Sequence, residues 1–225
     1  MPELQAPYPD LPAFEGTVLA VFAHADDELG VAAQLSVMGA QVRWILVSDN
    51  RGRFARKGNE RAELRWNEVC RAAAALGLRE PVPLGQPDGG LHSLDLASLL
   101  TPFLEPSVGA VVTHDVCGLY GHPDHLAVRD AMASLVRGTN IPLVSQALPA
   151  AFRRWVPLRR AARGRQRAPI THKFDMSPEM QGRKTAATLA HESQRHIFFA
   201  LMQGRSPAAF YRAFPREFLT LEVIE

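Results

Sequence analysis

Short continuous apolar runs alternate along the chain with longer segments that have helical spacing. The apolar runs have the length of strands and are rich in β-forming residues, so they are predicted as buried strands. The longer segments are predicted as helices, and Gly39 and Gly77 are plausible helix stops. The predicted strands are 17–22, 41–48, 81–84, 109–113 and 141–146, and the predicted helices are 27–38, 60–76, 94–104, 123–136 and 178–202.

This alternation predicts one Rossmann-like α/β domain over residues 1–225, with a mostly parallel sheet and helices on both faces. Residues 217–224 are expected to add an edge strand, and the arginine-rich segment at about 151–169 to form a loop or lid. In such a fold the functional site lies beyond the carboxyl ends of the strands. Residues with metal-binding chemistry should therefore follow the strands directly.

The composition is that of an ordinary soluble enzyme. Hydrophobic residues make up 47% and charged residues 21% of 225 residues. No apolar run has the length needed to cross a bilayer, and Met1 to Glu15 lack the pattern of a secretory signal. Cys70 and Cys117 form no close pair, so no disulfide scaffold is indicated. A cytoplasmic protein with no membrane partner is expected, and the sequence is compatible with a homo-oligomer.

The basic charge is local. Residues 151–167 hold seven arginines and no acid, and without them the net charge of +2 becomes about −5. This distribution argues against a general nucleic-acid binder. The arginines are interpreted as a solvated loop, or alternatively as a site for a phosphate or carboxylate on a substrate.

Two clusters of metal-binding residues follow two predicted strands. His24, Asp26 and Asp27 come directly after the strand 17–22, and His122 and His125 come after the strand 109–113. A catalytic zinc site needs three protein ligands of nitrogen and oxygen type and leaves one position for water, whose pKa the metal lowers to about 7. Asp27 alone could simply cap its helix, but two clusters at matching strand ends favour a metal site.

The motifs resemble those of a known family. His24-Ala-Asp-Asp-Glu28 resembles the Ala-His-Pro-Asp-Asp-Glu motif of the LmbE-like (PIG-L) zinc-dependent N-acetylglucosaminyl deacetylases, and Gly121 to His125 reads Gly-His-Pro-Asp-His, as in their second motif. Weaker matches are an Arg-x-x-Glu at Arg65, a Gln-Pro-Asp-Gly loop at Gln86 and a His-x-Ser-Gln at His191. The resemblance covers about residues 17–195.

The resemblance implies a role for each matching residue. His24, Asp27 and His125 would bind the metal, which is zinc with ferrous iron as the alternative, and Asp26 would be the general base. The other implied residues are His122 as oxyanion stabiliser or acid, Asp124 orienting its ring, Tyr120 polarising the acetyl carbonyl, and Arg65 and Asp88 holding sugar hydroxyls. Ala25 stands where the family usually has proline, which would fix φ at this position.

The function implied is removal of the N-acetyl group from an N-acetylglucosamine-type amino sugar conjugate, with release of acetate. Substrates in the family include precursors of low-molecular-weight thiols, glycolipids and antibiotic sugars, and nothing in the sequence selects among them. One alternative is a zinc amidase acting on a non-sugar N-acyl substrate. Another is a polyanion-binding module that uses the arginine-rich loop, which the full set of ligand, base and acid residues disfavours.

Overall fold

The sheet is mostly parallel, as predicted. The computed structural model describes residues 8–52, 58–153 and 156–225, and its seven-stranded sheet has the order β3-β2-β1-β4-β5-β7-β6. The first five strands in this order pair in parallel, whereas β7 pairs antiparallel with both β5 and β6. The strands are β1 Thr17–Phe22, β2 Val42–Ser48, β3 Val82–Gln86, β4 Val108–Thr113, β5 Leu143–Gln146, β6 His172–Asp175 and β7 Arg216–Glu222.

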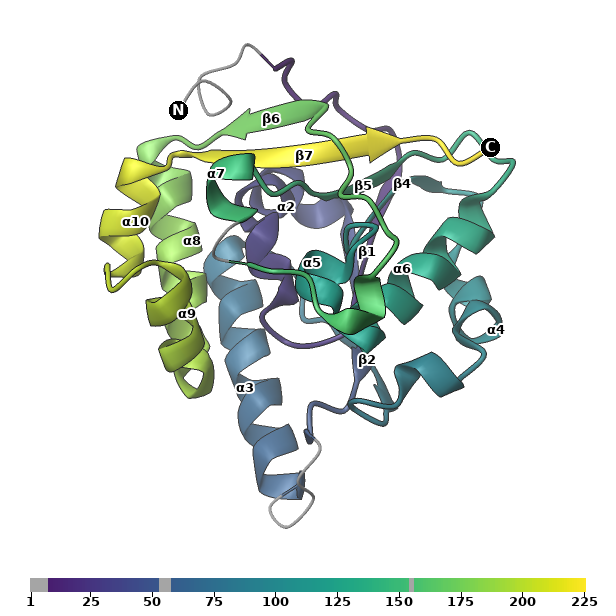
Figure 1. The fold of residues 1–225 in the computed structure, drawn as a ribbon, viewed down its shortest axis with the longest axis horizontal. Coiled ribbons are helices and arrows are strands. Elements are labelled where there is room, and N and C mark those ends of the chain that lie inside the picture. Colours follow the sequence, from purple (N-terminus) through teal and green to yellow (C-terminus); the bar gives the residue numbers. More distant parts are fainter. Residues whose placement is uncertain (1–7, 53–57, 154–155) are drawn as a thin grey trace.

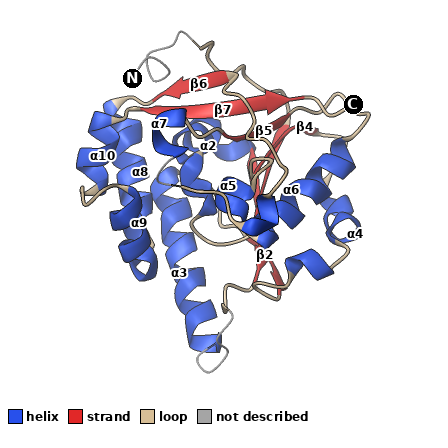
Figure 2. Cartoon of the chain, in the orientation of Figure 1, coloured by secondary structure: helices blue, strands red, loops and turns tan. Residues whose placement is uncertain are grey.

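Helices cover both faces of the sheet (Figures 1 and 2). The main ones are α2 Ala32–Met38, α3 Gly58–Leu76, α4 Leu96–Leu100, α6 Pro123–Val136, α8 Pro178–Ala190, α9 Arg195–Leu201 and α10 Pro207–Ala213. Short helical turns complete the chain: η1 Asp27–Gly30, η2 Gly39–Gln41, η4 Leu91–Ser93, η5 Thr101–Phe103, α5 Gly118–Gly121, α7 Ala150–Arg153, η6 Arg160–Ala162 and η7 Glu192–Gln194.

The core is divided by the sheet into two layers. Alternate residues of a strand point to opposite faces, and β1 is buried on both sides. Its residues Val18, Ala20 and Phe22 pack with residues of α2, α3 and α8, whereas Leu19 and Val21 pack with residues of α4 and α6. β1 therefore lies in the interior of the sheet, between β2 and β4, and the first motif follows its carboxyl end.

Most predicted elements are confirmed, although the predicted helix 27–38 is divided into η1 and α2 and the predicted helix 94–104 into α4 and η5. The C-terminal third shows the larger differences. The expectation of an edge strand at 217–224 is wrong, because β7 lies between β5 and β6. The predicted helix 178–202 is interrupted at η7, and β6 and α10 were not predicted. β6 has only four residues and α10 only seven, so neither gives a clear periodic signal.

The strand β7 also fixes the helix that follows the first motif. Glu217 on β7 accepts hydrogen bonds from the N–H groups of Ala33 and Gln34 in the first turn of α2, at 2.9 and 3.1 Å. The same carboxylate pairs with Lys184 of α8 at 2.6 Å, and both side chains are buried. A charge from the far end of the chain thus satisfies the free N–H groups at this helix start.

The arginine-rich segment packs onto the second motif. The N–H of Arg159 donates to the carbonyl oxygen of Tyr120 at 2.7 Å, and Arg165 forms two hydrogen bonds with Asp130. Gly121 has a φ of +86°, and a Cβ there would lie 3.0 Å from that of Ala162. Part of this segment, Arg154 and Trp155, lies outside the described residues.

Within the described part of the chain, no helix combines the length and hydropathy that a bilayer crossing requires.

Candidate metal centre

The two predicted clusters meet at the carboxyl end of the sheet. His24, Asp26 and Asp27 follow β1, with Asp27 at the start of η1, and His125 lies in the first turn of α6. Asp88 joins them from the turn after β3. Segments that are about 100 residues apart in sequence therefore bring their side chains together, as the strand-end rule predicts.

Potential ligand atoms of His24, Asp27 and His125 lie close to one another. His24 Nδ1 lies 3.2 Å from His125 Nε2, and His125 Nε2 lies 3.1 Å from Asp27 Oδ1. Asp27 Oδ2 lies 3.5 Å from His24 Nδ1. In a tetrahedral zinc site with bonds of about 2.0–2.2 Å, two ligand atoms are separated by roughly 3.3–3.6 Å. The two imidazoles and the carboxylate therefore fit one face of a zinc tetrahedron.

Two carboxylates contact the second ring nitrogen of His24 and favour the binding of a cation at the first. Its other ring nitrogen, Nε2, lies 3.2 Å from both Asp88 Oδ1 and Asp124 Oδ2. Such partners fix the tautomer of a ligating histidine and leave the opposite nitrogen for the metal. Burial works against a charge on His24, but its contacts with Asp124, Asp27 and Asp88 outweigh it and raise its pKa well above the ordinary value. The surroundings thus favour a positive charge at this point.

Asp124 is used differently from the sequence expectation. Its carboxylate accepts the N–H groups of Gly89 at 2.6 Å and Leu91 at 3.1 Å, in addition to its contact with His24. The resemblance implies that this carboxylate orients the ring of His122, whereas in the structure the carboxylate contacts His24 and it is the backbone N–H of Asp124 that donates to His122. The side chain is fully buried, so it is held in this position.

His114 lies beside the cluster but uses its nitrogen elsewhere. Its ring stacks on that of His125, with centroids 4.1 Å apart and planes 10° apart. His114 Nε2 is 3.6 Å from Asp27 Oδ2, but it accepts the backbone N–H of Ala23 at 3.0 Å. A nitrogen whose lone pair accepts a hydrogen bond has none to offer a metal. His114 Nε2 is therefore not free to bind a metal in this arrangement, although His114, Asp27 and His125 lie close enough together to hold one.

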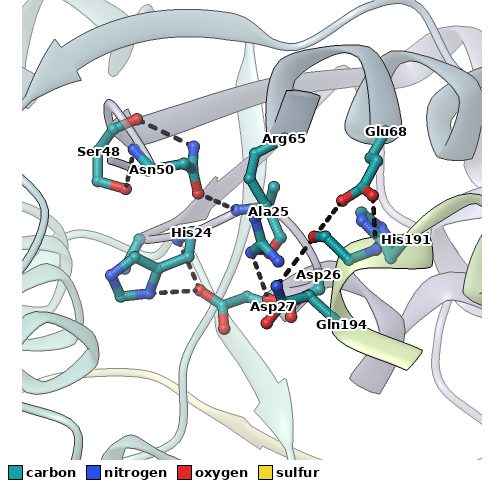
Figure 3. A network of polar contacts seen from close by, with 12 residues as sticks. His24, Ala25, Asp26, Asp27, Ser48, Asn50, Arg65, Glu68, His191 and Gln194 are labelled. Atoms are coloured by element: carbon teal, nitrogen blue, oxygen red, sulfur yellow. Dashed lines mark hydrogen bonds and ion pairs between the residues drawn. The ribbon is translucent and has the colours of Figure 1, made fainter. Parts of the chain in front are cut away.

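Asp26 lies on the same turn as His24 and Asp27 (Figure 3). Its φ of 95° is in the left-handed region, which residues other than glycine rarely adopt. Burial, together with the negative charges of Asp27 and Glu28, raises the pKa of Asp26 to about 6 despite the opposing charge of Arg65. Arg65 approaches its carboxylate to 3.3 Å and also donates to the carbonyl oxygen of Ala25.

His122 and Tyr120 complete the edge of the cluster. The rings of His122 and His24 meet edge to face, with centroids 4.8 Å apart. His122 Nδ1 accepts the backbone N–H of Asp124 at 3.3 Å, so the neutral ring carries its proton on Nε2. Burial and the neighbouring His24 and His125 lower the pKa of His122 to about 4. The ring of Tyr120 lies edge to face against those of His122 and His125, under the guanidinium of Arg159.

Two of the weaker motifs, at Arg65 and His191, contact each other and the first motif. His191 Nε2 lies 2.7 Å from Glu28 Oε1, and both side chains are fully buried. Glu68 accepts both the N–H and the hydroxyl of Ser193 at 2.7 Å. The first contact ties the end of α8 to the first motif, and the second ties α3 to η7, where Glu68 lies beside His191 and Gln194 (Figure 3).

Sequence reasoning missed one residue of this site, Asn50. Its side-chain oxygen accepts the backbone N–H of Ala25 at 2.9 Å. Asn50 follows the strand β2 by two residues, so a search of the strand ends for any polar residue, rather than for metal ligands alone, would have found it.

The cluster opens into a cavity of about 750 Å³. Side chains of the two motifs line one part of it, including His24, Asp26, Asp27, Asp88 and Tyr120. An apolar wall lines another part, and its members used below are Phe152, Phe198, Leu201, Phe210 and Phe214. The volume lies within the usual range for a small-molecule site.

The fold and the site define an α/β protein with a metal-binding cleft at the carboxyl ends of its parallel strands. The profile of the PIG-L family, described as GlcNAc-PI de-N-acetylase, matches residues 19–136. The chain belongs to this family, which confirms the resemblance found in the sequence. The matched residues include both motifs, whereas the apolar wall lies outside them.

Two relatives carry the name 1D-myo-inositol 2-acetamido-2-deoxy-alpha-D-glucopyranoside deacetylase. The protein from Saccharomonospora viridis is 29% identical, and the match covers 83% of this chain and 89% of that protein. The protein from Nakamurella multipartita is 28% identical, and the match covers 62% of this chain and 58% of that protein.

The same fold occurs among solved structures. A deacetylase of the teicoplanin biosynthesis pathway, solved as a complex with bog, aligns with a TM-score of 0.63 at 18% sequence identity. The alignment covers 92% of this chain and 98% of that chain. At this identity the likeness shows the fold alone, and it confirms the predicted α/β architecture.

Proposed function

We propose that this protein is a metal-dependent hydrolase that removes the N-acetyl group from an N-acetylglucosamine-type amino sugar conjugate and releases acetate. The observation that carries the proposal is the convergence of His24 Nδ1, Asp27 and His125 Nε2 within 3.5 Å of one another beside Asp26, at the wall of a ligand-sized cavity. Family membership and the names of the two relatives support the amino sugar as substrate.

The metal is proposed to be zinc, with ferrous iron as the alternative. Two imidazole nitrogens and one carboxylate suit either ion. His24, Asp27 and His125 would hold it, and Asp88 and Asp124 would orient His24 through its Nε2. When bound, the ion supplies a Lewis acid that lowers the pKa of a water molecule and polarises the acyl oxygen.

Asp26 is proposed as the general base. Its pKa of about 6 lies close to neutral pH, where a group can both accept and return a proton. The carboxylate takes a proton from the water that attacks the acetamide carbon. The same proton passes to the nitrogen as the C–N bond breaks, so that acetate and a free amine leave.

His122 is proposed to stabilise the oxyanion that forms at the acyl oxygen. The neutral ring, with Nδ1 occupied by the N–H of Asp124, has an Nε2–H to donate. Donors aimed at developing negative charge contribute strongly in a cavity that excludes water. Tyr120 is proposed to add its hydroxyl to the same oxygen. The binding of sugar hydroxyls by Arg65 and Asp88 stays a prediction, since both side chains contact the first motif in this structure.

Further expectations from the sequence stay predictions: a cytoplasmic location, a homo-oligomer and a lid at 151–169. A polyanion-binding role gains no support, because Arg153, Arg165 and Arg167 donate to carbonyl oxygens of this chain.

The experiment that tests the proposal combines metal analysis with an acetate-release assay. Purified protein is loaded with zinc or ferrous iron and assayed on N-acetylglucosamine conjugates and on N-acetyl amino acids. We expect about one metal ion per chain and release of acetate from the sugar conjugates. Full metal occupancy with acetate released only from N-acetyl amino acids would favour the zinc amidase over the sugar deacetylase.

A further inference from the structure

The backbone at Asp26 adopts a conformation that has to be held by its surroundings. Its φ of 95° and ψ of −15° lie in the left-handed region. An L-residue with a side chain rarely stays there without outside support. The direction of the Asp26 carboxylate depends on this turn, so whatever holds the turn also positions the proposed base.

Side chains bind three consecutive N–H groups of this turn. The N–H of His24 donates to Asp27 Oδ2 at 2.7 Å, and the N–H of Asp26 donates to Glu28 Oε2 at 3.0 Å. Both of these acceptors belong to the turn itself. The middle N–H, that of Ala25, donates to Asn50 Oδ1 at 2.9 Å. Asn50 is therefore the one acceptor of the three that ties the turn to another strand end.

Asn50 is itself held in the orientation that this contact needs. Its Nδ2 donates to the carbonyl oxygen of Ser48 at 3.3 Å, and its own N–H donates to the Ser48 hydroxyl at 3.3 Å. These contacts leave Oδ1 facing Ala25 (Figure 3). Asn50 and Ala25 are both buried, so water does not replace the hydrogen bond.

We infer that Asn50 is a positioning residue that holds the Ala25–Asp26 turn, and with it the proposed base, through the N–H of Ala25. The inference rests on the proposed function of Asp26. It also gives a physical account of Ala25 in the first motif. Proline fixes φ but has no N–H, and at this position it would leave Asn50 without its donor. In this chain a hydrogen bond from the end of β2 fixes the turn instead.

The test is a double-mutant cycle of Asn50→Ala and Ala25→Pro, read as kcat and KM on an N-acetylglucosamine conjugate with metal content measured for each variant. Asn50→Ala should lower kcat between about 10-fold and 100-fold, because small misplacements of a reacting group have effects of this size. KM and metal content should stay near their wild-type values. In the Ala25→Pro background, Asn50→Ala should have almost no further effect on kcat, since its partner is already gone.

Asn50 also lines the cavity, and a direct contact with substrate is the competing explanation. That contact would raise KM by the same factor in both backgrounds, and this result would overturn the inference. A fall in kcat on Asn50→Ala that is as large in the Ala25→Pro background as in the wild type would do the same. The exposed Asn140 provides the matched control, and Asn140→Ala should leave kcat, KM and metal content unchanged.

A second measurement needs no activity and covers the case in which the proline variant does not fold. Amide hydrogen exchange of the segment around Ala25 should be slow in the wild type and in Asn140→Ala, and at least about tenfold faster in Asn50→Ala, because the buried N–H loses its acceptor. Unchanged exchange in Asn50→Ala would overturn the inference. A wild-type protein that releases no acetate but shows this exchange pattern would instead count against the proposed function, so the two failures are distinguishable.

Discussion

At the scale of single residues, the site gives two adjacent aspartates different surroundings, which suit the different roles proposed for them. Asp27 faces His24 and His125, and although burial opposes it, His125, His114 and His24 hold the pKa of Asp27 well below the ordinary value. Asp26 faces Arg65 on the strained turn, and burial raises its pKa to about 6. A metal ligand has to stay ionised, whereas a base has to exchange a proton, and the two environments match these needs.

This division predicts the effect of Asp26→Asn. We expect the variant to bind metal as the wild type does and to lose activity by a factor of about 10² to 10⁴, the usual contribution of a general base. Metal content and acetate release measured on the same preparation check the prediction. His125→Ala is the comparison, and it should lose the metal together with the activity. Wild-type turnover by Asp26→Asn would refute the assignment of the base.

The position of His114 leads to a second prediction at this scale. His114→Phe preserves the ring stacked on His125 but leaves the buried N–H of Ala23 without an acceptor. An unpaired buried N–H costs about 1–3 kcal/mol. We expect the free energy of unfolding, measured with urea, to fall by this amount while metal content is unchanged. Loss of the metal from His114→Phe would show that His114 is a ligand after all.

At the scale of elements, the sequence predicted the half of the chain that carries the site better than the half that encloses it. Strands such as β1 are continuous apolar runs between clear stops, so residues 17–22 were predicted to the residue. His24 and His125 were found by the same logic, since each follows a strand. The C-terminal elements are short, and the sequence predicts β7 as an edge strand, whereas β7 pairs with both β5 and β6.

Residues that act through tertiary contacts were harder to predict. Asn50 carries no metal-binding chemistry, and its function depends on the N–H of Ala25, which is close only in the folded chain. The pairing of Asp124 with His24 similarly depends on how the first turn of α6 lies against the end of β1. A motif fixes which residue types are present, but the packing of the elements decides their partners.

The pair of Glu217 and Lys184 gives a prediction at the scale of elements. Glu217→Ala removes the acceptor for two N–H groups of α2 and leaves Lys184 buried without its carboxylate. Breaking a buried ion pair in this way costs about 3–5 kcal/mol, and urea unfolding should show a loss of this size. The double variant Glu217→Gln with Lys184→Met retains an acceptor and removes the stranded charge, so it should be destabilised less. Equal stability of Glu217→Ala and the wild type would contradict the capping role.

At the scale of the whole molecule, the proposed metal links the site to stability. Its ligands come from the end of β1 and from α6, which are far apart in the sequence. A ligand present at about 1,000 times its Kd stabilises the folded state by about 4 kcal/mol. A chelator should therefore lower the Tm of the wild type by several degrees, and added zinc should restore it. The Tm of His125→Ala should respond to neither, and a chelator response of equal size in this variant would exclude the proposed site.

The cavity joins two chemically different walls, and this combination bears on the choice of substrate. The motif side offers carboxylates, imidazoles and a phenol, which suit an amino sugar and its acetamide. The apolar wall comes from α7, α9 and α10 and from Phe214 after α10, and the rings of Phe152, Phe210 and Phe214 pack together with centroids between 5.0 and 6.4 Å apart. A monosaccharide bound at the motifs would leave this wall in contact with water, whereas an apolar aglycone would cover it.

We therefore expect N-acetylglucosamine conjugates with an aryl or alkyl aglycone to have a lower KM than the methyl glycoside. Phe210→Ala should raise KM for the apolar conjugates about 10-fold to 100-fold, as expected from the loss of about 1.5–3 kcal/mol of burial, and should leave the methyl glycoside unaffected. Phe199→Ala makes the same chemical change at a side chain that is 58% exposed on α9, and it should change neither KM. If Phe210→Ala raised KM equally for both substrates, its effect would be on the shape of the site rather than on the aglycone. A preference for the methyl glycoside in the wild type would mean that the substrate does not reach this wall.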